Sequence, residues 1–157
     1  MPELAEVETL VNGLKSKIIG YRIFDIYHED NSRFQPMGSI GQVINNISRK
    51  GKFLVFSLDN KEMLISLGMT GKLLLGENND SNHRRCMYFL INGNERICLS
   101  YVDARGFGSI KVVNPGDYSG IMLKLGPDPL DHDFELTVNY QYNLIRKSNK
   151  HIKAILL

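Results

Sequence analysis

The feature that most constrains this chain is a series of short β-prone segments between residues 21 and 113, separated by turn signals. The segments are rich in β-branched and aromatic residues, which favour pleated strands. Glycine and asparagine mark the turns, most clearly at Asn92–Glu95. The predicted strands are Tyr21–Tyr27, Gln42–Ser48, Lys52–Leu58, Met63–Leu67, Lys72–Leu75, Cys86–Ile91, Arg96–Val102 and Ser109–Val113. Short strands at this spacing predict a sandwich or a flattened barrel, and 157 residues suffice for one core.

Helical patterns stand on both sides of the predicted strands. Apolar residues recur at steps of three and four from Leu4 to Ile18, which predicts a helix with Pro2 in its first position and Gly20 at its end. A second helical pattern runs over Leu136–Lys147. The final residues Ile152–Leu157 are apolar and uncapped, so we expect a chain cut at a domain boundary. The expected division is a β domain over residues 1–135 and a helical segment over 136–157.

The charge of the chain is nearly balanced, so its overall charge does not indicate that it binds nucleic acid. The formal net charge is +2. Basic residues gather at Arg49–Lys52, at Arg84-Arg85 and from Arg146 to Lys153. Charge alone favours the interpretation that these are solvated surface patches.

Three sequence features bear on the compartment. No apolar run approaches the roughly 20 residues that span a bilayer, and the acidic start does not resemble a secretory signal. Cys86 and Cys98 each lie inside an apolar run, which favours buried free thiols over a disulfide. We therefore expect a cytoplasmic protein without a membrane segment, and the spacing of these cysteines predicts no metal site.

Pro2 is the residue with the most distinctive chemistry. Removal of Met1 would leave a secondary amine at the start of the chain, and a free α-amino group has a pKa of about 7.7–8.0. Such an amine can attack the C1′ carbon of a deoxyribose, expel the base and leave an iminium, from which strand cleavage by elimination follows. The plain alternative is that Met-Pro begins many unremarkable proteins.

Five ordered motifs resemble the formamidopyrimidine-DNA glycosylases, bacterial enzymes that excise 8-oxoguanine and ring-opened purines. The first is the opening Met1–Thr9, which departs from the family pattern at Ala5, where the family has proline. The four later motifs are Arg49–Lys52, Leu67–Gly71, Asp103–Gly108 and Leu125–Leu130. The resemblance spans the whole chain and replaces the plain interpretation of Pro2.

The resemblance implies roles for four residues at the reaction centre. Pro2 is expected to be the nucleophile and Glu3 the acid that protonates the sugar ring oxygen. Glu6 is expected to orient the amine or the sugar, and Lys52 to hold a phosphate beside the lesion. The alternatives are that both glutamates merely favour the start of a helix and that Lys52 is a surface lysine.

The resemblance also implies a group that fills the hole left by a flipped nucleotide. Met69 and Phe107 are expected to be apolar wedges, and Arg105 to hydrogen-bond the orphaned cytosine. On spacing alone, Met69 would be expected in the core and Phe107 in a hairpin loop.

Two departures from the family lie at expected DNA contacts. Ser66 stands where the family has a histidine that contacts phosphate, and Gly106 stands where a second basic residue is common. Both changes are expected to weaken the grip on DNA rather than the chemistry. Lys153 matches a family lysine that faces DNA near the domain hinge.

The resemblance further implies a mainly β fold, in which an N-terminal helix packs on a two-layer antiparallel β-sandwich and a C-terminal helix leads to a missing domain. That domain holds a helix–two-turn–helix module and a structural zinc in the family, so no cofactor or metal is expected in this chain. The expected partner is damaged double-stranded DNA, bound by a monomer associated with the bacterial nucleoid. Two rivals stay open, a non-catalytic DNA-binding relative and an inactive structural fragment.

Overall fold

The protein is described by a computed structural model that covers residues 2–76, 82–125, 128, 138–139, 142–143 and 145–149, with only the backbone of Ile121. The chain divides into two compact units, Met1–Ser119 and Gly120–Leu157. The boundary expected between residues 135 and 136 and the candidate Lys153 both lie outside the described residues.

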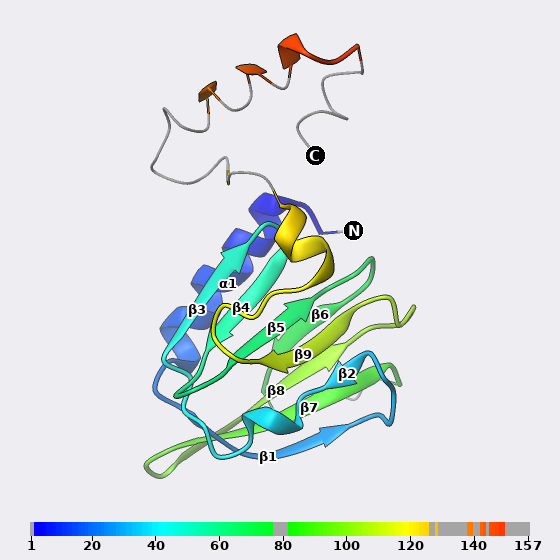
Figure 1. Cartoon of the computed structure of the whole chain (residues 1–157). Helices are drawn as coiled ribbons and strands as arrows, with labels where there is room; N and C mark the ends of the chain where they lie inside the picture. Colours follow the sequence, from blue (N-terminus) through cyan, green and yellow to red (C-terminus); the bar gives the residue numbers. More distant parts are fainter. Residues whose placement is uncertain are drawn as a thin grey trace. The chain divides into compact units, whose positions relative to one another are not determined.

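Helix α1 (Leu4–Ile18) buries the apolar stripe that its sequence predicts, formed by Val7, Val11, Leu14 and Ile18. It contacts β3 (Asn46–Lys50) and β4 (Phe53–Ser57) (Figure 1). The expected start of this helix was wrong, because Pro2 precedes the helix instead of beginning it. Glu3 is the N-cap residue with an extended backbone, and its carbonyl accepts the amide hydrogens of Glu6 and Val7 at 3.1 Å each.

The strands form two sheets. The four-stranded sheet has the order β1-β7-β8-β6 and is antiparallel throughout. Its strands are β1 (Arg22–His28), β7 (Arg84–Asn92), β8 (Glu95–Val102) and β6 (Lys72–Leu75). The five-stranded sheet has the order β2-β9-β5-β4-β3. Its strands are β2 (Phe34–Gln35), β9 (Ser109–Val113), β5 (Glu62–Ser66), β4 (Phe53–Ser57) and β3 (Asn46–Lys50).

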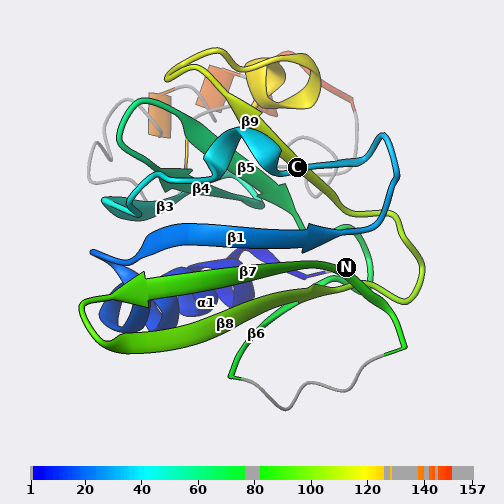
Figure 2. The same ribbon diagram turned by 90° about the horizontal axis from the view of Figure 1, so that it is seen from below.

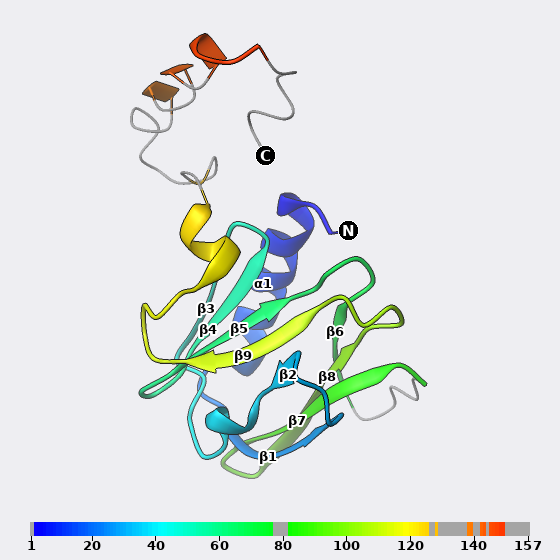
Figure 3. The same ribbon diagram turned by 45° about the vertical axis from the view of Figure 1, so that its right-hand side comes forward.

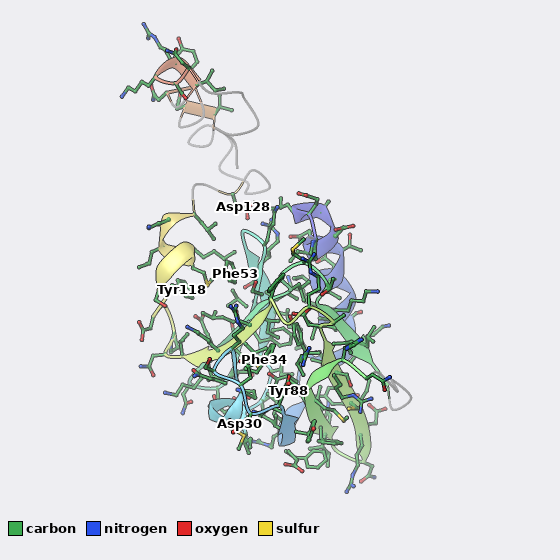
Figure 4. The ribbon with its side chains drawn as sticks, turned by 90° about the vertical axis from the view of Figure 1, so that its right-hand side faces the viewer. Asp30, Phe34, Phe53, Tyr88, Tyr118 and Asp128 are labelled. Carbon is green, nitrogen blue, oxygen red and sulfur yellow. The ribbon has the colours of Figure 1, made fainter. Side chains whose placement is uncertain are left out.

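The two sheets are stacked as layers, with one hydrophobic core between them (Figure 2). The core includes Phe34 and Tyr88, which lie inside the first unit in Figure 4 and are at most 1% exposed. The cluster also includes the buried face of α1. The predicted fold class, an N-terminal helix on a two-layer β-sandwich, is therefore confirmed.

The structure differs from the expected strands at two places. Strand β2 pairs in parallel with β9, so the second sheet is mixed rather than purely antiparallel (Figure 3). Strand β3 begins at Asn46, four residues after the predicted start at Gln42. The intervening backbone bonds instead to the chain around β1, where Ile44 donates to Tyr21 at 2.9 Å and Ile23 donates to Gln42 at 2.9 Å.

Cys86 and Cys98 are both buried and are not in a disulfide, as the sequence predicts. Cys86 has no exposed surface and Cys98 is 6% exposed. Burial raises the pKa of Cys86 to about 12, because a thiolate loses its hydration in the core.

The second unit begins with the 3-10 helix η2 (Gly120–Lys124). Helical backbone follows at residues 138–139, 142–143 and 145–146, within the predicted helix Leu136–Lys147, whose other residues except Lys147 lie outside the described part. In the parts of the chain that the structure describes, no helix combines the length and the apolar character that a membrane crossing needs.

Candidate functional site

The residues before α1 form a fixed extended segment. Pro2 is half-buried, while Glu3 and Glu6 are exposed. The Glu6 carboxylate accepts the backbone N–H of Glu3 at 2.8 Å. This bond satisfies an amide that precedes the first helical turn and fixes the peptide that joins Pro2 to Glu3.

Lys52 reaches the same segment from the turn between β3 and β4. Its Nζ lies 3.2 Å from Oε2 of Glu3. The two side chains are 29% and 69% exposed respectively, so the pair is open to solvent on the side of the glutamate. Two of the residues expected at the reaction centre, 49 positions apart in the chain, thus meet at the start of α1.

A second ion pair, which the sequence did not indicate, supports this turn. Arg49 Nε lies 2.7 Å from Oε2 of Glu8 in α1, and the Arg49 side chain is only 6% exposed. Arg49 also donates to the carbonyl of Gly51 at 3.2 Å. The ammonium of Lys50 lies 4.4 Å from the centre of the Tyr118 ring. The basic cluster Arg49–Lys52 is therefore not an open patch, since each of its charges has a partner.

An open pocket of about 530 Å³ lies beside the start of α1. Pro2 and Glu6 line it from the N-terminal segment, and Met69 lines it from the loop after β5. Leucine side chains supply much of the remaining wall. The expected nucleophile and one expected wedge residue therefore share one pocket.

The Met69 loop, which we define as Leu67–Gly71, packs backbone to backbone against a second loop, Asp103–Gly108. A Cβ atom on Gly68 would lie 2.6 Å from the Gly108 nitrogen and 2.7 Å from the Phe107 carbonyl carbon. Gly68 also has a φ of +56°, in the left-handed region that favours glycine. Only glycine therefore permits this approach of the two loops.

Asp103 connects these two loops through its carboxylate and is fully buried. Its Oδ1 accepts hydrogen bonds from the Thr70 hydroxyl at 2.5 Å and the Arg105 amide at 3.2 Å. Its Oδ2 accepts the Gly108 amide at 2.8 Å. Burial by itself would raise the pKa of Asp103, but these hydrogen bonds to the charged form outweigh it and lower the pKa below its ordinary value.

The three residues expected to fill the hole left by a flipped nucleotide, Met69, Arg105 and Phe107, belong to this loop pair. Met69 is 45% exposed and Phe107 is 51% exposed, so neither is a core residue. The guanidinium carbon of Arg105 lies 5.0 Å from the centre of the Phe107 ring. At the base of the loops, the carbonyl of half-buried Ser66 accepts the Tyr101 hydroxyl at 3.1 Å.

Arg85 and Glu29 are further residues that the sequence did not single out as a pair. Arg85 Nη1 donates to both carboxylate oxygens of Glu29, at 2.9 Å and 2.7 Å. Arg85 Nε donates to the backbone carbonyl of Asp103 at 2.9 Å. The only sequence signal for this pair is the Arg84-Arg85 doublet, and it does not reveal a partner 56 positions away.

Among the described residues, no group of three or more histidine, cysteine, aspartate or glutamate side chains is arranged to hold a metal ion.

Comparisons with known proteins first define a class. The family model of the formamidopyrimidine-DNA glycosylase N-terminal domain matches residues 1–110. Thermus thermophilus MutM (Fpg) has a crystal structure that matches with a TM-score of 0.82 at 34% identity, covering 99% of this chain and 57% of that one. Lactococcus lactis Fpg in complex with DNA containing an abasic site matches with a TM-score of 0.83 at 29% identity, covering 99% and 60%. The fold is thus that of the N-terminal domain of DNA glycosylases of this kind.

Sequence relatives give the particular family. A formamidopyrimidine-DNA glycosylase of Enterococcus faecalis is 36% identical over 170 residues, which cover all of this chain and 58% of that protein. One of Bacillus cereus is 33% identical, with coverage of 100% and 59%. The chain belongs to the formamidopyrimidine-DNA glycosylase family, and it spans just under three fifths of the length of these relatives.

Proposed function

We propose that the protein acts in base-excision repair, as a glycosylase that removes oxidised purines such as 8-oxoguanine and formamidopyrimidines from double-stranded DNA. The observation that carries this proposal is the shared pocket of Pro2 and Met69, with the Glu3–Lys52 pair beside it. Membership of the family supports it, and so do the family's complexes with DNA containing an abasic site, a formamidopyrimidine or a carbocyclic 8-oxoguanine.

The proposed chemistry begins after Met1, which lies outside the described residues, has been removed. The lone pair of the Pro2 nitrogen attacks C1′, and the bond from C1′ to the base breaks with its electrons leaving on the base, which takes up a proton. The nitrogen then gives up its own proton to Glu3, and Glu3 passes this proton to the ring oxygen as the nitrogen lone pair opens the sugar to an iminium. Loss of the C2′ proton then expels the 3′ phosphate by β-elimination, a δ-elimination releases the 5′ phosphate, and water frees the sugar remnant from Pro2.

The protein's other site residues hold the substrate in this proposal. Lys52 sits beside Glu3, where it can bind a phosphate next to the lesion. Met69 and Phe107 fill the space vacated by the flipped nucleotide, and Arg105 pairs with the orphaned base. Ser66 has no charge to offer a phosphate, so we expect a weaker contact there than a histidine would give. Lys153 is proposed to face DNA as well.

Borohydride trapping tests the proposal. The full-length protein is incubated with an 8-oxoguanine duplex and borohydride, which reduces the iminium to a stable crosslink, and the crosslinked peptide is identified by mass spectrometry. We expect a protein that lacks Met1 and an adduct on the Pro2 nitrogen. Insertion of one alanine between Met1 and Pro2 converts that nitrogen to an amide and leaves every side chain in place.

We expect this insertion to lower the trapping rate about 100-fold or more. An adduct on a lysine, formed at the same rate with the insertion, would overturn the assignment of Pro2. Tight binding of the duplex with no adduct in the wild-type protein would favour the rival, a DNA-binding relative without chemistry. That rival is motivated by Ser66 and Gly106, which stand where the family has or commonly has basic residues.

A further inference from the structure

We propose that Thr70 and Asp103 are positioning residues that join the two loops into one rigid wedge, so that Met69 and Phe107 enter DNA as a unit. This inference rests on the proposed function, because it assigns the loops a joint task in nucleotide flipping. Neither residue is placed in contact with the reacting atoms.

The Thr70 hydroxyl is the link between the loops. It donates to Oδ1 of Asp103 at 2.5 Å and accepts the backbone N–H of Arg105 at 3.1 Å. Thr70 directly follows Met69, and Arg105 lies two residues before Phe107. One hydroxyl group therefore connects the backbone beside one wedge residue to the backbone beside the other.

Asp103 is a firm anchor for this link because it is fixed on several sides. Its amide donates to the carbonyl of His83 at 2.9 Å, and its carbonyl accepts Arg85 Nε at 2.9 Å. Arg85 is in turn held by the two oxygens of Glu29. Hydrogen bonds from Thr70 and backbone amides stabilise the buried carboxylate, and a bond to a charged acceptor is stronger than a neutral one.

A flipping enzyme benefits from this coupling. Separating stacked bases costs a few kcal/mol, so the DNA tends to restack and expel the inserted side chains. Met69 and Phe107 are exposed and project from separate loops, so their joint insertion depends on how firmly the two loops are held together. A preorganised wedge avoids ordering the two loops during insertion.

The test compares two substitutions of Thr70 in the full-length protein. Thr70→Val keeps the shape but removes the hydroxyl, and Thr70→Ser keeps the hydroxyl as the matched control. Two rates are measured under single turnover. One is excision from a fully paired 8-oxoguanine duplex, which requires flipping, and the other is borohydride trapping on a single-stranded abasic site, which does not.

We expect Thr70→Val to lower duplex excision about 10- to 100-fold, the range for loss of a hydrogen bond to a charged group. Trapping on the single strand should change by less than about 3-fold, and Thr70→Ser should stay within about 3-fold on both substrates. Equal losses on both substrates, or unchanged duplex excision in a folded Thr70→Val protein, would overturn the inference. If the wild-type protein traps neither substrate, the proposed function itself fails.

A double-mutant cycle tests the joint action of the wedge residues. With Thr70 present, the double variant Met69→Ala/Phe107→Ala should lose less duplex excision than the product of the two single losses, because loss of either side chain disables the same unit. In the Thr70→Val background, the two effects should become independent. Independent effects in both backgrounds would contradict a single wedge.

Discussion

The Tyr101 hydroxyl is tightly packed against the backbone beneath the two loops. Two glycines, Gly71 and Gly108, approach it closely. A Cβ atom on Gly108 would lie 1.7 Å from this oxygen and 2.6 Å from the Ser66 carbonyl, and one on Gly71 would lie 2.6 Å from the same oxygen. The hydroxyl itself donates to the Ser66 carbonyl at 3.1 Å. Only a hydrogen atom fits at either glycine.

We predict that Gly108→Ala lowers the free energy of unfolding by about 1–3 kcal/mol, because tyrosine or backbone must move to admit the methyl group. Gly13→Ala is the control. Gly13 lies on the exposed side of α1 with no atom within 4 Å of an added Cβ, so alanine should stabilise by about 0.5–1 kcal/mol. Urea unfolding of the three proteins measures both effects. Equal midpoints for Gly108→Ala and wild type would show that the structure can accommodate a methyl group at this position without strain.

At this scale, the sequence revealed the residues with distinctive chemistry but not those that hold them. The ordered motifs identified Pro2, Glu3, Lys52 and Met69. In the structure, Pro2 and Met69 line the same pocket, and Glu3 and Lys52 form an ion pair. Asp103 lay inside a motif and received no role. Its importance comes from burial and from donors on two loops, which no local pattern records.

Among the elements, α1 and β3 are joined by a charge pair that also supports the turn of Lys52. Glu8 lies on α1 and is 37% exposed, while Arg49 lies on β3 and is 6% exposed. A guanidinium with so little access to water depends on its carboxylate partner.

We predict that Glu8→Gln destabilises the protein by about 1–2 kcal/mol, since the buried charge of Arg49 loses its partner. In an Arg49→Met background the same change should cost less than about 0.5 kcal/mol, because the cation that the Glu8 carboxylate balances is absent. Thermal and urea unfolding of the four proteins of this cycle give both values. A cost for Glu8→Gln that is the same in both backgrounds would assign the effect to α1 alone.

The elements were predictable to the extent that their own residues determine them. β6 and β9 have the predicted bounds, because their apolar runs are cut off by turns. β2 was not predicted, since a strand of two residues has no measurable period and forms only because β9 lies beside it. Residues 42–45 were predicted as the first part of strand β3. Their backbone instead forms hydrogen bonds with the chain around β1, and these partners are close only in the folded chain.

For the whole molecule, the first unit holds a complete core. Among the described residues, all members of the buried cluster lie between Val7 and Ile110, within the unit Met1–Ser119. The fold class was predictable because the number of short strands leaves few other architectures. The division after Ser119 was not, since no change of composition marks it.

We predict that a fragment of residues 1–119 folds cooperatively without the rest of the chain. Its thermal midpoint should lie within about 5 °C of that of the 157-residue chain, a difference near 1 kcal/mol. Near-ultraviolet circular dichroism and urea unfolding check this. A fragment that lacks fixed aromatic signals, or melts without a cooperative transition, would mean that the first unit needs residues beyond 119.

The sequestered sulfur atoms of this fold have a consequence for the conditions in which the protein works. Peroxide attacks cysteine through its thiolate, and the first product is a sulfenic acid. Cys86 has no exposed surface and stays protonated far above neutral pH, and Cys98 is almost as enclosed. A protein proposed to remove oxidised bases is needed most when oxidants are abundant. Its packed interior keeps its own thiols out of reach of the agents that damage the DNA.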